Sequence, residues 1–183
     1  MEINNLSSNE YFLREPSEEN LEELLTLITD SMRSYSRDSG IDPSILDSMH
    51  ETCDDLRKKL QTHRILCYFD SDSHPVGTIT LKIREDLTSL KYSDITKDYI
   101  GDAGKVLYIS RFAVLDTLRG TGLGVKLLDE AAEYAKENGV DLLILHTAVR
   151  NTGRVEFYIN RGFELIDSES SRGYERGLFG KRI

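Results

Sequence analysis

A glycine-rich stretch at residues 119–124 is the part of the sequence whose residue types and spacing point most directly to chemistry. It reads Arg-Gly-Thr-Gly-Leu-Gly and lies between an apolar run at residues 106–114 and an amphipathic run at residues 125–138. Glycines let the backbone approach a ligand closely, and a helix N-terminus offers unpaired N–H groups to an anion. The sequence therefore predicts a site for a phosphorylated cofactor.

Two common phosphate-binding motifs do not fit this spacing. A Rossmann G-x-G-x-x-G fingerprint would need glycine at position 125 or 127, where valine and leucine stand. A Walker P-loop that begins at residue 120 would also need glycine at position 125. What remains is the pattern Arg-x-x-Gly-x-Gly, which starts at Arg119 and places its spaced glycines at Gly122 and Gly124.

This pattern resembles the acyl-CoA-binding signature of the GNAT acyltransferases, usually written Gln/Arg-x-x-Gly-x-Gly/Ala. A second stretch is also similar to that family, because Asn151 precedes Tyr158 by seven residues and Gly162-Phe163 opens the next strand. The matching motifs lie within residues 106–166. The resemblance implies an α/β fold: a central mixed β-sheet, splayed between two parallel strands and flanked by helices. It also implies acetyl-CoA as the acyl-donor substrate.

The resemblance further implies where the cofactor binds. The end of the strand at residues 106–114 would pair with the pantetheine arm, and one of its N–H groups would polarise the thioester carbonyl. The guanidinium of Arg119 and the amides of the glycine turn would hold the pyrophosphate. The expected cofactor-binding residues are Phe112, Ala113, Val114, Arg119, Gly120, Thr121, Gly122, Leu123, Gly124, Val125 and Asn151.

Tyr158 is the expected general acid. Aminolysis of a thioester requires a proton for the departing sulfur, and a phenol near that sulfur can supply it. Family members commonly use the tyrosine at this motif position. The alternative is a core aromatic whose hydroxyl is satisfied, or a residue that only positions the cofactor.

The general base is less directly indicated. Several family members place a His or Glu four or six residues before the end of the strand that precedes the glycine turn, and those positions here are Ser110 and Tyr108. Other members place a Glu twelve residues before the catalytic tyrosine, and that position is His146. An imidazole suits a base at physiological pH, although a hydrogen-bonded core histidine is the alternative. Ser110 and Tyr108 are the second option, as holders of a relay water.

Periodicity predicts the elements that must position these residues. Residues 142–149 are almost continuously apolar, as in a strand buried on both faces, so residues 106–149 form a parallel βαβ unit. The remaining elements are an edge strand at 11–14, a helix capped by Ser17 that breaks at 36–40, a second helix spanning 46–60, an antiparallel hairpin at 64–84 and a polar connection at 85–105.

Composition is that of a globular chain. Its 183 residues suit a single domain over 1–183, with residues 1–8 expected to be flexible. The net charge of −9 argues against nucleic acid and is compatible with a cationic acceptor. With no apolar run long enough for a bilayer and no secretory signal, we expect a cytoplasmic protein without a membrane partner. Cys53 and Cys67 show no metal spacing, so no metal site is expected.

The sequence therefore predicts an acyl-CoA-dependent N-acyltransferase, an acetyltransferase that works by direct attack of a primary amine. The acceptor is expected to be a small amine or a peptide N-terminus, and the enzyme a monomer or homodimer. Two alternatives remain at this stage. One is a non-catalytic module that binds or senses acyl-CoA, and the other is an acyltransferase similar to the acyl-homoserine lactone synthases.

Overall fold

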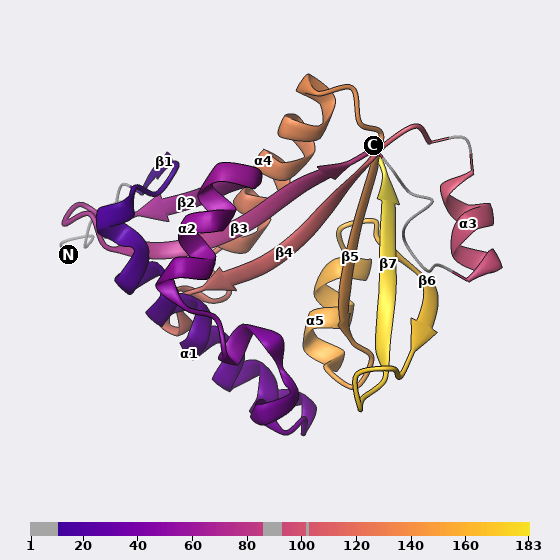
Figure 1. Ribbon diagram of the computed structural model, residues 1–183, viewed down its shortest axis with the longest axis horizontal. Helices are drawn as coiled ribbons and strands as arrows, with labels where there is room; N and C mark the ends of the chain where they lie inside the picture. Colours follow the sequence, from indigo (N-terminus) through magenta and orange to yellow (C-terminus); the bar gives the residue numbers. More distant parts are fainter. Residues whose placement is uncertain (1–10, 86–92, 102) are drawn as a thin grey trace, which may run out of the picture.

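The protein is built around one seven-stranded sheet, whose strand order is β1-β2-β3-β4-β5-β7-β6 (Figure 1). This computed structural model describes residues 11–85, 93–101 and 103–183. The expected flexibility of residues 1–8 lies outside those residues. The strands are β1 Phe12–Arg14, β2 Arg64–Phe69, β3 Pro75–Arg84, β4 Val106–Val114, β5 Leu142–Ala148, β6 Glu164–Glu169 and β7 Arg176–Arg182. The α-helices are α1 Leu21–Ser39, α2 Cys53–Thr62, α3 Asp94–Ile100, α4 Leu123–Glu137 and α5 Thr152–Ile159.

The predicted mixed sheet with one splayed parallel pair is confirmed. β4 and β5 are parallel, and all the other pairs of neighbouring strands are antiparallel. The β4–β5 ladder covers only three residue pairs, the last of which joins Ile109 to Leu145. Beyond that pair the two strands diverge toward their C-terminal ends and open a V in the sheet (Figure 1).

The period-two pattern of β2 separates the two faces of the sheet. Leu66 and Tyr68 pack into the cluster that contains α4, whereas Ile65, Cys67 and Phe69 pack against α1 and α2. Alternate side chains of a strand point to opposite faces, so the helices cover both sides. The structure thus places α4, which follows the glycine turn, and α1 on opposite faces of the splayed sheet.

The N-terminal half confirms one expectation and corrects another. The first helix ends within the predicted break at 36–40, because it continues to Ser39 and stops at Gly40, whose φ of +66° is the left-handed conformation that glycine favours. The second helix does not span residues 46–60. Residues 43–49 form two 3₁₀ turns, and α2 starts at Cys53 because Thr52 and Asp55 form a capping box there.

The polar connection at residues 85–105 contains an element that the sequence reading missed. Ser93 accepts a hydrogen bond from the amide of Thr96 and caps α3. The Thr96 hydroxyl donates to Asp167 at 3.0 Å, which fixes this helix against β6. Among the described residues, no helix combines the length and apolar character needed to cross a membrane.

We expect Leu127→Ala to destabilise the fold by about 3 kcal/mol, because Leu127 is fully buried where α4 packs on β3 and its removal leaves a cavity. Leu115→Ala is the matched control, since that leucine is 39% exposed, and its loss should be below about 1 kcal/mol. Urea unfolding of the two variants measures both values. Equal losses would contradict the assignment of α4 to the core.

Candidate active site

The glycine turn and the last residues of β4 line one cavity of about 450 Å³. Phe112 and Val114 contribute their side chains from β4, and Asn151 and Tyr158 lie at the opposite wall, at the start and within α5. Eight of the expected cofactor-binding residues line this cavity: Phe112, Val114, Arg119, Gly120, Gly122, Gly124, Val125 and Asn151. The structure therefore brings together segments that lie more than 30 residues apart.

Three further expected residues do not line this cavity. Ala113 and Leu123 are buried in the core, and Ala113 pairs with Thr78 on β3. The hydroxyl and the amide of Thr121 both donate to the carbonyl of Leu118, at 2.7 and 3.3 Å. These residues therefore offer a ligand at most backbone atoms, not side chains.

The turn itself requires glycine for a conformational reason. Gly120 and Gly122 have φ values of +80° and +92°, and a Cβ at either position would meet no atom within 4 Å. The first amide of α4 bonded to a turn carbonyl is that of Lys126, which donates to Gly122 at 3.1 Å. The amides of the first helical turn before it have no intrahelical partner and are available to an anion.

Asn151 has one polar atom whose partner is missing. Its side-chain oxygen caps α5 by accepting from the amide of Arg154 at 3.2 Å. The side chain is 4% exposed, and within the described part of the chain its Nδ2 has no hydrogen-bond acceptor. A buried donor without a partner costs free energy, so this amide is suited to the carbonyl of a bound ligand.

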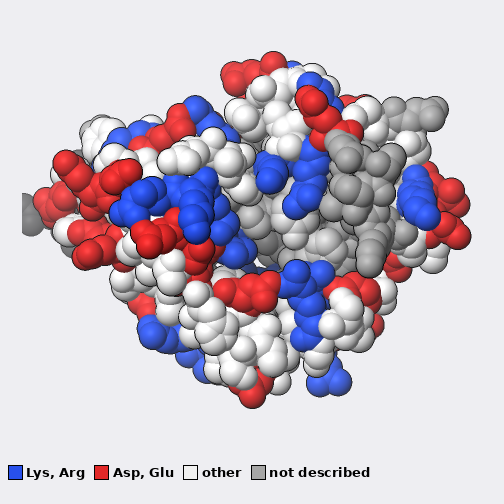
Figure 2. Space-filling model, in the orientation of Figure 1, with Lys and Arg blue, Asp and Glu red and all other residues white. Residues whose placement is uncertain are grey.

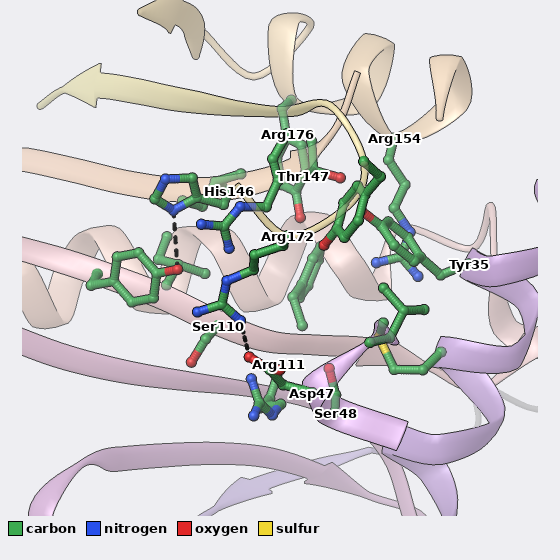
Figure 3. Close-up of a pocket in the computed structure, with 18 of the residues that line it drawn as sticks. Tyr35, Asp47, Ser48, Ser110, Arg111, His146, Thr147, Arg154, Arg172 and Arg176 are labelled. Atoms are coloured by element: carbon green, nitrogen blue, oxygen red, sulfur yellow. Dashed lines mark hydrogen bonds and ion pairs between the residues drawn. The ribbon is translucent and has the colours of Figure 1, made fainter. Parts of the chain in front are cut away.

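A second cavity, of about 360 Å³, also lies at the opening between β4 and β5, and Figure 3 shows the side chains that line it. Tyr108 and Ser110 line it from β4, and His146 lines it from β5. Tyr158 lines both cavities and therefore lies at their junction. All three residues expected to be catalytic, Ser110, His146 and Tyr158, thus face one space.

Tyr158 is held by a cluster of aromatic rings. Its ring lies 6.2 Å from that of Phe112 and 5.7 Å from that of Phe163, measured between centroids. Burial raises the pKa of Tyr158 to about 12. The phenol is therefore protonated at neutral pH, which is the state that a general acid requires.

His146 is paired with Tyr108. The Tyr108 hydroxyl lies 3.1 Å from His146 Nδ1, and Figure 3 shows the contact at the cavity wall. Burial first, and then the nearby Arg176, lower the pKa of His146 to about 4. The imidazole is therefore neutral at pH 7, and when Nδ1 donates to Tyr108, Nε2 keeps a free lone pair.

A β-bulge shapes β4 beside these groups. Thr80 pairs with Ser110 and Thr78 with Ala113, so two residues of β4 lie opposite Ile79 alone. Arg111 lies in this bulge with a φ of +50°, a strained conformation for a residue with a side chain. The surrounding structure must hold that strain in place.

Glu51 provides that restraint, and the sequence reading did not identify it. Its carboxylate is 2% exposed and accepts two bonds from Arg111, with Nε at 2.7 Å and Nη2 at 3.2 Å. Lys59 of α2 pairs with the same carboxylate. This triad of Glu51, Lys59 and Arg111 ties the bulge to α2 and to the turn before it.

The described residues contain no cluster of three or more His, Cys, Asp or Glu side chains that could hold a metal ion. Both cysteines are free. Burial raises the pKa of Cys67 to about 12, so its thiol is protonated. Neither cysteine lines the two cavities.

Comparison with known proteins identifies the family. The model of the Acetyltransferase (GNAT) family matches residues 22–163, so this chain belongs to that family. It is 33% identical to a probable N-acetyltransferase, san, of Drosophila melanogaster over 64 residues, which are 34% of this chain and 35% of that protein. It is 38% identical to an uncharacterised N-acetyltransferase of Methanocaldococcus jannaschii over 79 residues, which are 43% of this chain and 33% of that protein. The matches thus span about a third of these relatives' lengths.

Solved structures share the whole fold at low sequence identity. PaiA N-acetyltransferase from Thermoplasma acidophilum, crystallised with coenzyme A, has a TM-score of 0.71 at 19% identity and covers 95% of this chain and 99% of its own. Arabidopsis thaliana NAA60, crystallised with a bisubstrate analogue, has a TM-score of 0.73 at 18% identity and covers 95% of this chain and 98% of its own. These likenesses confirm the predicted fold.

We expect Glu51→Gln to destabilise the protein by about 3 kcal/mol, because it leaves Arg111 and Lys59 facing each other without a buried counter-charge. Asp54→Asn is the matched control: its carboxylate is 78% exposed and pairs with Arg57, so its loss should be below about 1 kcal/mol. Chemical unfolding distinguishes the two. Similar unfolding midpoints for both variants would show that the triad does not restrain the bulge.

Proposed function

We propose that this chain transfers an acetyl group from acetyl-CoA to the primary amine of a small molecule or a peptide N-terminus. The observation that carries the proposal is the position of Tyr158, which lies where the two cavities meet. One cavity has the amides and glycines suited to a phosphorylated donor, and the other has the groups suited to an acceptor. A transfer reaction needs two substrates in contact at one point.

The donor would occupy the cavity beside the glycine turn. The free amides at the start of α4 and the guanidinium of Arg119, which also pairs with Asp116 at 2.6 Å, would hold the pyrophosphate. The unpartnered Nδ2 of Asn151 would donate to the pantetheine arm. The strand end at residues 112–114 would provide the backbone pairing and an N–H group for the thioester oxygen.

In the proposed reaction the neutral amine attacks the acetyl carbon directly. A bond forms between nitrogen and the acetyl carbon, the carbon–sulfur bond breaks, and the CoA sulfur leaves with the proton of Tyr158. The amine gives up its own proton to His146, either directly or through a water held by Tyr108 and Ser110. Neither cysteine lies at the junction, so no acyl-cysteine intermediate is involved.

A non-catalytic acyl-CoA-binding module is the second candidate. Such a module needs only the first cavity, whereas this chain also has a second cavity in which Tyr108, Ser110 and His146 converge. That convergence favours the enzyme. The likeness to acyl-homoserine lactone synthases remains the weakest alternative, because those proteins lack a comparable glycine turn.

Release of free CoA thiol from acetyl-CoA, measured against a panel of amines, amino acids and peptides, tests the reaction class. Thiol release that depends on an added amine supports the transferase. Absence of thiol release with every amine, together with a rise in melting temperature on adding acetyl-CoA, would favour the binding module.

Tyr158→Phe should lower kcat by about 10²- to 10³-fold, because the CoA sulfur then leaves without a proton donor. The KM for acetyl-CoA should stay within about threefold, since the phenyl ring keeps its packing against Phe112 and Phe163. Tyr134→Phe on α4 is the control and should retain full activity. Unchanged kcat in the Tyr158 variant would refute the general-acid role.

His146→Gln should lower kcat/KM and also flatten the pH dependence of stability. The folded pKa of about 4 lies below the unfolded value of about 6.5. Between these values the unfolded state binds the additional proton, so His146 lowers stability by up to about 3 kcal/mol as pH falls from 6.5 to 4. Unfolding measurements across this range should show a shallower slope in the variant.

His74→Gln is the control for this measurement. The His74 pKa is raised by its hydrogen bond to Glu23, so its stabilising contribution is present below pH 6.5 and is lost as pH rises. Its removal should leave the slope between pH 6.5 and 4 unchanged, because the contribution of His74 is constant there and changes only above pH 6.5. The same slope in wild type and His146→Gln would show that His146 titrates normally.

A further inference from the structure

The second cavity carries far more positive than negative charge, although the chain as a whole has a net charge of −9. Among the described residues, Asp47 is the only one with an acidic side chain that lines it. Figure 2 shows Lys and Arg side chains on both sides of the central hollow. The cationic side chains that line the cavity are those of Lys59, Arg84, Arg111, Arg154, Arg172 and Arg176.

Nearby carboxylates neutralise only part of this charge. Four of the six cations share three carboxylates, through the pairs Arg111–Glu51, Lys59–Glu51, Arg172–Asp47 and Arg176–Glu169. The other two, Arg84 and Arg154, form no ion pair with any described residue. Counted over the described residues, the six cations and their three paired carboxylates leave an excess of three positive charges around the cavity.

Arg84 has the least satisfied of these side chains. Its Nε is buried and has no hydrogen-bond acceptor among the described residues. Its guanidinium lies over the ring of Tyr108, 5.2 Å from the centroid. A buried N–H donor without an acceptor is costly unless a ligand supplies one, and Tyr108 is the partner of His146.

The two histidines of the cavity respond to this charge. After burial, the cations Lys82, Lys59, Arg84 and Arg111 lower the pKa of His63 to about 4. Arg176 and Arg84 act on His146 in the same direction, and Glu169 opposes them. Arg84 and Arg176 therefore both lie close enough to the Tyr108–His146 pair to act on it, from β3 on one side and β7 on the other.

We propose that the acceptor is a small amine that also carries an anionic group, a carboxylate or a phosphate, and that Arg84 and Arg176 bind this group. The proposal rests on the transferase function above and narrows its acceptor. Guanidinium groups bind carboxylates and phosphates through paired hydrogen bonds. Arg176 Nε donates a hydrogen bond to Glu169 Oε1 at 2.5 Å, and Figure 3 shows the guanidinium of Arg176 directed into the cavity.

The size of the cavity and the position of the two arginines limit the acceptor further. A space of about 360 Å³ fits a small molecule. Because Arg84 and Arg176 flank the Tyr108–His146 pair, the anionic group and the nucleophilic nitrogen are separated by only a few bonds. Free amino acids and short aminoalkyl phosphates have this arrangement, whereas polyamines have the opposite charge.

The same charge assists the chemistry. An ammonium group that enters a positive cavity has its pKa lowered, which favours the neutral amine that attacks the thioester. The anionic group compensates for the repulsion and brings the amine in. A weak base such as His146, with a pKa of about 4, is then sufficient to take the remaining proton.

The test compares matched acceptors in the thiol-release assay. The pairs are glycine and glycinamide, aspartate and its diamide, and O-phosphoethanolamine and ethanolamine, with putrescine and an acidic tetrapeptide added. We expect kcat/KM to be at least 30-fold higher for the anionic member of a pair. The amino-acid and phosphate pairs show which anion is used. Preference for the neutral amines, for putrescine or for the peptide alone would overturn the proposal.

Arg84→Met should raise the KM for the preferred anionic acceptor at least tenfold more than it raises the KM for the neutral counterpart. Arg84→Lys should restore most of the affinity, because it keeps the charge. Arg33→Met, on the exposed face of α1, is the control and should behave as wild type. Equal effects of Arg84→Met on both members of a pair would overturn the role of Arg84.

A further measurement separates this proposal from the proposed function. The rise in melting temperature caused by acetyl-CoA should be the same in Arg84→Met as in wild type, which shows that the variant is folded and that the donor site is intact. Thiol release with neutral or cationic amines only would overturn the anionic acceptor and leave the transferase standing. No thiol release with any amine would overturn both.

Discussion

The separation of β4 from β5 after three residue pairs is the constraint on which the rest of the structure depends. Parallel strands that continued side by side would use their backbone groups on each other and leave no space between them. Because they diverge after Ile109 and Leu145, the strand ends must find other partners. The two cavities lie at this opening, and Tyr158 lines both of them. Because the β4–β5 ladder is short, backbone groups at the strand ends remain available to bind a ligand.

Maintaining that opening requires compensation elsewhere. The bulge at Arg111 re-aims the end of β4, and its positive φ is held by the buried carboxylate of Glu51. On the other wall, α5 begins with the cap of Asn151 and places Tyr158 within a cluster of aromatic rings. Strain at one strand and a rigid helix at the other keep the two sides of the site apart at a fixed distance.

Local patterns in the sequence were sufficient to predict three parts of the fold. The βαβ unit, the hairpin and the glycine turn each depend on residues close in the chain, and the structure contains all three. The second helix was misplaced because the apolar stripe at residues 46–60 continues across the cap at Thr52. Glu51 lies 60 residues from Arg111, and no local pattern links them. An arginine within a predicted strand only signals that some buried partner must exist.

The charge of the acceptor cavity shows why net charge is a poor guide to a site. The −9 of the whole chain is compatible with a cationic acceptor, yet the wall of the cavity is rich in arginine. Surface charges act across water, where they are screened. Charges in a half-enclosed cavity act through a medium of lower dielectric constant, so the local excess of positive charge determines the electrostatic potential inside the cavity. His146 is kept neutral first by burial and then by Arg176 and Arg84. The same arginines would then select an anion-bearing amine and lower its pKa, which couples recognition of the acceptor to its activation.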